Sequence, residues 1–249
     1  MPICALWYNN FMENTYDFAF ENWGDKEFAK LLTTLESLAH PENAEWENRI
    51  VNTHYPLLSI YTKPLRDIAK SIAKGNALSF LSGNPCHYHE ELVLQGFVIS
   101  ALKDAEEQMR LLPAFLAKCD SWAHTDSLKF RITKANESKW FDYAKSLICA
   151  NGTFERRCGI LIFFKFLQTD RLQDVFAVLA SLREEKEYYV NMAISWLMCE
   201  AFVKRREETL AFLASDSLSP WTQNKAISKC RDSFRVSPAD KELLLTLKK

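Results

Sequence analysis

The sequence predicts an all-α fold in which pairs of helices stack into a right-handed α-α superhelix. Three observations lead to this prediction. The 249 residues include only six glycines and eight prolines, too few for the turns that a sheet protein of this length needs. Apolar residues recur at helical spacing along most of the chain. Similar residue steps also return after the length of one helix pair.

The first predicted helix covers residues 27–39, where five apolar side chains share one face: Phe28, Leu31, Leu32, Leu35 and Leu38. Three prolines interrupt the segment that follows, and the last of them is Pro64. Pro64 suits the first turn of a helix over residues 65–74, and Gly75 then stands at the C-cap of that helix.

Five further helices are expected, over residues 77–81, 87–102, 105–118, 137–150 and 153–167. Asn136 is placed to cap the fourth of them, with Glu137 behind it. The pair Asn151-Gly152 marks the sharp turn before the fifth.

The C-terminal half of the chain carries a weak internal repeat. A small residue is followed by isoleucine at Gly159, Ala193 and Ala226, at intervals of 34 and then 33 residues. That is the length of a helix-turn-helix repeat, and the small residue would let neighbouring helices approach closely. The helices over 153–167 and 187–204 are apolar nearly all round, as inner helices of a stack should be. The pattern favours a solenoid of HEAT- or ARM-like repeats.

The composition is that of a globular protein, and we expect residues 1–249 to form one helical-repeat domain. Its first 60 residues are divergent and acidic, with three Lys/Arg against nine Asp/Glu, whereas residues 61–249 look repeat-like. The net charge of the chain is −1. A dedicated nucleic-acid binder usually carries a larger basic excess. The balance therefore argues mildly against tight, non-specific DNA binding and still allows a basic groove.

Nothing in the sequence indicates export or a membrane. Residues 1–8 have no basic lead, and the longest apolar run, residues 159–164, is far shorter than a membrane span. The seven cysteines are scattered without a CxxC spacing, which is typical of reduced thiols. We therefore expect a cytoplasmic protein.

Several short motifs follow one another in order. Residues 64–70 read Pro-Leu-Arg-Asp-Ile-Ala-Lys and residues 89–94 read His-Glu-Glu-Leu-Val-Leu. Trp122 is followed four residues later by Asp126, and Arg156-Arg157 opens a helix that reaches Lys165. Residues 188–196 and 224–236 complete the set. In this order and spacing the motifs resemble the DNA alkylation repair family of HEAT-like-repeat DNA glycosylases, from residue 57 to the C-terminus.

The resemblance implies a helical horseshoe that holds duplex DNA on its concave face as a monomer. It implies excision of purines alkylated at N3 or N7, with no metal or cofactor and without drawing the base into a pocket. Asp126 would be the catalytic carboxylate, and Trp122 and Trp196 would wall an aromatic cleft. Arg157 and Lys165 would contact phosphates.

So sparse a site suits the chemistry. Alkylation at N3 or N7 makes the purine cationic and a good leaving group, so no general acid is needed. One carboxylate can stabilise the oxocarbenium-like sugar and direct water onto C1′. Two indole faces beside it favour a developing cation and exclude bulk water.

Each residue also has a purely structural interpretation. Trp122 and Trp196 could be core aromatics, and Asp126 could cap a helix that starts at Ser127. Arg157 lies in a strongly apolar helix and must find an anion there. At about 100° per residue, Lys165 would lie about 80° round that helix from Arg157.

The segment Cys86-His87-Tyr88-His89-Glu90 invites comparison with a zinc site. Its ligands are crowded and no second pair exists elsewhere, so we expect no metal there.

Two departures from the family pattern concern the site itself. Residues Ala123-His124-Thr125 separate Trp122 from Asp126, whereas well-studied excising members carry an acid directly after the Trp. Such members also tend to have an arginine at the position of Cys199.

Two other functions stay open: a non-catalytic relative that binds unusual DNA structures, and a protein-binding solenoid. Base excision would separate the glycosylase from both. A steep loss of DNA affinity with added salt would separate the DNA binder from the protein binder.

Overall fold

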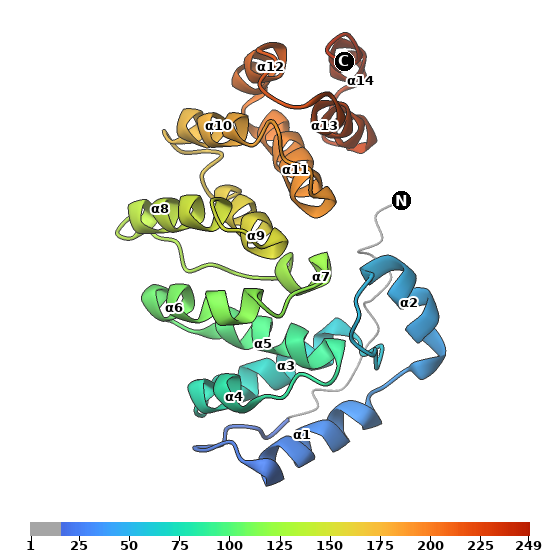
Figure 1. Cartoon of the computed structure of the whole chain (residues 1–249), viewed down its shortest axis with the longest axis vertical. Coiled ribbons are helices and arrows are strands. Elements are labelled where there is room, and N and C mark those ends of the chain that lie inside the picture. Colours follow the sequence, from blue (N-terminus) through green and yellow to red (C-terminus); the bar gives the residue numbers. More distant parts are fainter. Residues whose placement is uncertain (1–15) are drawn as a thin grey trace. The chain divides into compact units, whose positions relative to one another are not determined.

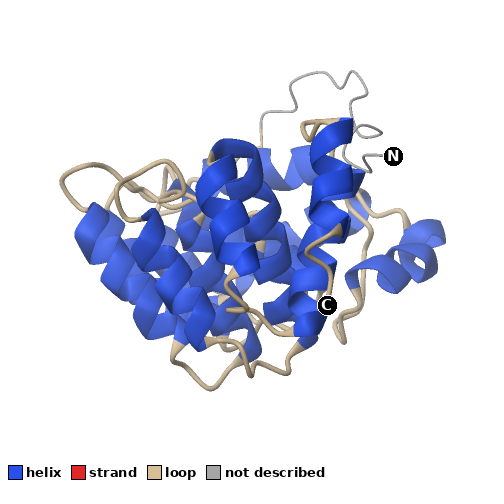
Figure 2. Ribbon diagram, turned by 90° about the horizontal axis from the view of Figure 1, so that it is seen from above, coloured by secondary structure: helices blue, strands red, loops and turns tan. Residues whose placement is uncertain are grey.

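The computed structural model describes residues 16–249, and this part of the chain is all-helical, with no β-strand (Figures 1 and 2). It divides into two compact units, the described residues up to Arg131 and Ile132–Lys249. None of the described helices is both long and apolar enough to span a membrane. The predicted helical-repeat architecture is confirmed. That residues 1–249 behave as a single domain stays a prediction.

The first unit is built around one buried helix. Its elements are α1 (Asp25–Ser37), η2 (Pro41–Asn43), α2 (Ala44–Val51), α3 (Thr62–Ile72), α4 (Ala77–Gly83), α5 (His89–Ala101), α6 (Ala105–Leu116) and α7 (Trp122–Thr125). Helix α5 is buried along nearly its whole length and contacts α3, α4, α6 and α7. The core of this unit gathers side chains of α1, α3, α4 and α5.

The second unit is a stack of helix pairs. Its elements are α8 (Glu137–Ile148), α9 (Thr153–Phe163), α10 (Leu172–Ser181), α11 (Tyr188–Lys204), α12 (Arg206–Ala214), α13 (Pro220–Asp232) and α14 (Pro238–Leu245). The inner helices α9, α11 and α13 contact one another in succession. The rings of Phe176 on α10 and Phe212 on α12 stack 4.5 Å apart between the outer helices.

The repeat predicted from small residues is confirmed in position. Gly159, Ala193 and Ala226 lie on α9, α11 and α13, and all three are buried. At Gly159 the close approach is to the paired helix α8. A Cβ there would lie 2.6 Å from the Ala144 carbonyl oxygen and 2.7 Å from Ile148 Cγ1. Glycine is therefore required where α8 and α9 cross.

Two expected caps differ from the prediction. Helix α3 ends at the C-cap Ala73, and no described glycine has a positive φ. Gly75 is needed for space instead, because a Cβ there would lie 2.5 Å from the Phe20 carbonyl oxygen. Asn136 stands at the N-cap of α8, but its side-chain oxygen accepts the Thr133 N–H at 2.7 Å and bonds no helical N–H.

Replacement of Gly159 by alanine should destabilise the second unit by about 1–3 kcal/mol, because the added methyl overpacks the contact between α8 and α9. Thermal unfolding of the Gly159→Ala variant measures the effect. Gly24→Ala is the control, since its Cβ would meet nothing closer than 3.4 Å. Equal melting temperatures for the two variants would contradict the packing account.

Candidate functional site

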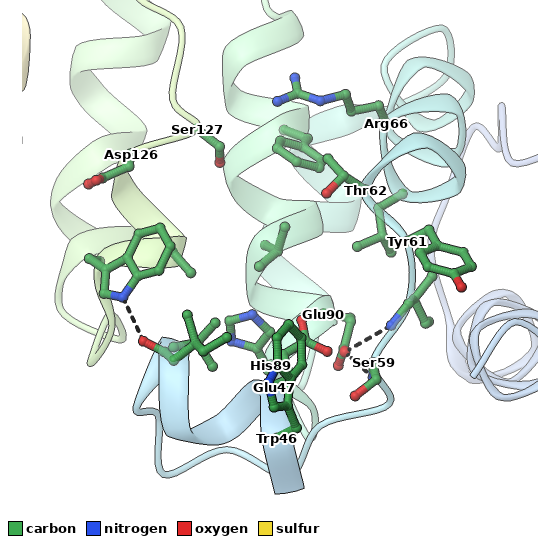
Figure 3. Close-up of a pocket in the computed structure, with 18 residues that line it drawn as sticks. Trp46, Glu47, Ser59, Tyr61, Thr62, Arg66, His89, Glu90, Asp126 and Ser127 are labelled. Atoms are coloured by element: carbon green, nitrogen blue, oxygen red, sulfur yellow. Dashed lines mark hydrogen bonds between the residues drawn. The ribbon is translucent and has the colours of Figure 1, made fainter. Parts of the chain in front are cut away.

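The first unit contains a cavity of about 440 Å³ (Figure 3). Its walls come from α2, α3, α5, α7 and the chain between α2 and α3. Trp122 and Asp126, both predicted as site residues, line it together. Trp46 on α2 lines it as well.

Trp122 opens the short helix α7 and is half-buried. Its indole Nε1 donates a hydrogen bond to the Ile50 carbonyl of α2, at 3.1 Å. The bond fixes the indole against the cavity wall and joins two segments that are 72 residues apart in the chain. Trp122 is therefore more than core filling.

Asp126 is the C-cap of α7, and its N–H bonds the Trp122 carbonyl at 3.0 Å. Its carboxylate accepts the Thr125 hydroxyl at 3.2 Å. No helix begins at Ser127, so the alternative in which Asp126 is an N-cap is wrong: there are no free helical N–H groups for it to bind. Figure 3 shows Asp126 among the lining residues, beside Ser127.

Helix α2 is fastened at its C-terminal end by Asp120, Ser121 and Trp122, a set of contacts that we call the α2 clasp. Besides the Trp122 bond, the Ser121 hydroxyl donates to the Val51 carbonyl. The two carboxylate oxygens of Asp120 accept the Thr53 hydroxyl and the His54 N–H, each at 2.7 Å. The last carbonyls of a helix need such partners, and here the residues around the site provide them.

The same bonds control the charge of Asp120. Burial alone would raise the pKa of Asp120, but the His54 N–H and the Thr53 hydroxyl outweigh it and hold the pKa below its usual value. The contacts of the α2 clasp therefore stabilise the ionised form of Asp120.

Behind the cavity, two histidines share a hydrogen bond. His124 Nε2 lies 2.9 Å from His89 Nδ1, and His89 also lines the cavity. Burial, helped by the neighbouring His124, lowers the pKa of His89 to about 3. Burial likewise lowers the pKa of His124 to about 4, although Asp120, 3.6 Å away, opposes it. Both rings are therefore neutral near pH 7.

Glu90 is a buried carboxyl group in the cavity wall. Its oxygens accept the backbone N–H groups of Leu58, Ser59 and Ile60 at 2.6 to 3.4 Å (Figure 3). Burial raises the pKa of Glu90 despite these donors. The carboxyl group thus holds the chain between α2 and α3, where Ser59 has a φ of 58°.

One cationic side chain borders the cavity. The Arg66 guanidinium lies 4.4 Å from the centre of the Phe97 ring, within the range of a cation–π contact. Asp126, Glu47 and Glu90 are carboxyl groups in the same wall. The lining of the cavity is therefore largely apolar, and acidic groups outnumber basic ones among its charged side chains.

The other three predicted residues lie in the second unit. Arg157 on α9 is only 5% exposed, and its Nη1 donates to the Tyr189 carbonyl at 2.5 Å. Trp196 on α11 is half-buried, with its ring 4.6 Å from that of Phe164. Lys165 is exposed, but it follows the end of α9 at Phe163. The helix predicted over 153–167 is therefore too long. Because Lys165 lies beyond the end of α9, the angle predicted between Arg157 and Lys165 around one helix does not apply.

The positions that depart from the family pattern are also explained locally. Ala123 lines the cavity without a charge, and His124 is used in the histidine pair. Cys199 is a free, buried thiol on α11 that neighbours the free thiol of Cys230 on α13.

Sequence reasoning missed Trp46, Glu47 and Arg66. Helix α2 was not predicted because prolines lie on either side of it. Pro41 followed by acidic residues is nevertheless a usual helix start. Trp46 and Ile50, four residues apart, form the apolar face that could have revealed it.

Comparison with known families gives a match to the family described as DNA alkylation repair enzyme, over residues 31–230. The match covers most of the chain and reaches into both units. No curated protein was found to match.

Acidification should destabilise the first unit through the histidine pair. In the unfolded chain a histidine has a pKa near 6.5, whereas the folded values are about 3 and about 4. Below pH 6.5 the unfolded chain binds more protons, so the free energy of unfolding falls with the pH until about pH 3. The loss is on the order of 3 kcal/mol per histidine.

Urea unfolding between pH 7.5 and 4 measures this loss. The double variant His89→Asn, His124→Asn should show a shallower pH dependence, and His87→Asn, an exposed position, is the control. Parallel curves for the wild type and the double variant would exclude the pair as the cause.

Proposed function

This chain is a member of the DNA alkylation repair enzyme family, which gives it a role in the repair of alkylated DNA, and from that premise we propose that it is a DNA N-glycosylase. The proposed substrate is duplex DNA with a purine alkylated at N3 or N7. The base is hydrolysed off without being drawn into a pocket, and no metal or cofactor takes part. The protein acts as a monomer in the cytoplasm.

The observation that carries the proposal is the cavity that brings Asp126 and Trp122 together. The bond between C1′ and the purine nitrogen breaks, and its electron pair neutralises the cationic base. The sugar is left as an oxocarbenium-like cation. The Asp126 carboxylate stabilises that cation and orients the water that attacks C1′.

The single negative charge of the Asp126 carboxylate is enough to change the rate of excision substantially. Two opposite unit charges about 4 Å apart attract by about 4 kcal/mol at an effective dielectric constant near 20. That is roughly a thousandfold in rate. The partly buried position of Asp126, beside the indole of Trp122, keeps bulk water from weakening the interaction.

The second unit is proposed to hold the DNA. Lys165 is exposed after the end of α9 and is assigned to a phosphate. Arg157 is assigned to a phosphate as well, and its bond to the Tyr189 carbonyl steadies the start of α11. Trp196, on the same helix, is assigned to the aromatic cleft.

A second candidate function is duplex binding without excision. Two positions favour duplex binding without excision. Ala123, next to Trp122, is uncharged, and Cys199 is a buried thiol, whereas excising relatives carry charged residues at both positions.

Asp126→Asn keeps the size of the side chain and removes its charge. Excision of 7-methylguanine from duplex DNA should fall by about a thousandfold in single-turnover assays, with duplex binding largely retained. Asp142→Asn, at an exposed site on α8, is the matched control. A wild-type rate in Asp126→Asn would refute the catalytic role. Binding without any excision by the wild-type protein would favour the second candidate.

Lys165→Ala should weaken damaged and undamaged duplexes equally, because phosphate contacts carry no base information. The slope of log K against log salt should decrease by about one. Lys26→Ala, on the acidic α1, is the control. Arg157→Ala should act in the same direction and also lower the melting temperature, since Arg157 is buried. An effect limited to one lesion would show that the residues have another role.

A further inference from the structure

We infer that Trp46 touches the substrate and forms a further aromatic wall of the excision site. The inference rests on the proposed function, because it assigns Trp46 a part in the same reaction. Trp46 lines the same cavity as Trp122 and Asp126, from a different helix.

Trp46 is exposed in a way that core aromatics are not. Its side chain is 54% exposed, although it lines a cavity whose other walls are largely apolar. Burial of a large aromatic surface is favourable, and an indole left half-open beside a cavity is available to a ligand. Figure 3 shows Trp46 at the edge of the cavity, next to Glu47.

The α2 clasp sets the position of Trp46. Trp46 lies one helical turn before Ile50, and both side chains line the cavity. The Ile50 carbonyl accepts the Trp122 indole N–H. This hydrogen bond therefore links α2, which carries Trp46, to Trp122, which lies one helical turn before Asp126.

The surroundings define the chemistry of the ligand. Indole faces attract cations, and the carboxyl groups of Glu47 and Asp126 line the same cavity, which Arg66 also borders. Such a surface suits a cationic nucleoside better than a phosphate. In the proposed reaction the positive charge passes from the alkylated purine to the sugar, and a nearby indole stabilises both.

The test compares single-turnover excision of 7-methylguanine by Trp46→Ala, Trp46→Gln and Trp46→Phe. Loss of the aromatic face should slow excision about tenfold in the first two variants. The phenylalanine variant should stay within about threefold of wild type, because it keeps an aromatic face. Trp221→Ala, which removes a 47% exposed indole from α13, is the matched control and should excise normally.

Two further readouts separate substrate contact from a structural role. Melting temperature and affinity for undamaged duplex should be unchanged in all three Trp46 variants, because the side chain is half-exposed. If Trp46→Ala unfolds, Trp46→Gln, with a good helix-forming residue, carries the test. Excision within twofold of wild type in the truncated variants overturns the inference.

The outcome also distinguishes this inference from the proposed function. Normal excision by the Trp46 variants together with lost excision in Asp126→Asn overturns the inference alone. A wild-type protein that releases no base overturns both. If excision slows in every Trp46 variant and the melting temperature falls by the same amount in each, the role of Trp46 is structural. That result would also overturn the inference.

Discussion

The hydrogen bonds of the α2 clasp are the constraint on which the candidate site depends. Asp120, Ser121 and Trp122 bind the last carbonyls of α2 and the chain just after it. These bonds join the C-terminal end of α2 to the segment that leads into α7 and so help to fix where α2 lies. They also orient the segment that ends in Asp126. The same hydrogen bonds thus satisfy the last carbonyls of α2 and position two sides of the cavity, α2 and the segment around α7.

The segment behind the clasp has no stability of its own. Helix α7 has four residues, too few to persist alone in water. Its shape comes from tertiary partners: the α2 carbonyls on one side and His89, through His124, on the other. Ser121, His89 and His124 are buried, so losing the partner of one of them would leave a buried polar group unsatisfied. The few groups proposed to act in catalysis therefore depend on many supporting contacts.

The sequence predicted the long helices well, because α1, α3 and α8 bury one regular apolar face and α5 and α11 are buried nearly all round. It failed where tertiary contacts override periodicity. Phe166 and Leu167 continue the apolar pattern of α9 and are buried, yet they lie in turns beyond its end at Phe163. Trp122 and Asp126 were found through a motif whose spacing survives in this chain. Trp46 belongs to no motif, and only the fold brings it to the cavity.

The proposed role of the Asp126 carboxylate is to stabilise a positive charge on the sugar inside this cavity. It is tested most directly by affinity for duplex DNA that carries a cationic azasugar in place of the damaged nucleotide. The reference is the same duplex with a neutral tetrahydrofuran site. A site complementary to the transition state should bind the cationic duplex at least about tenfold more tightly. Equal Kd values for the two duplexes would contradict the account.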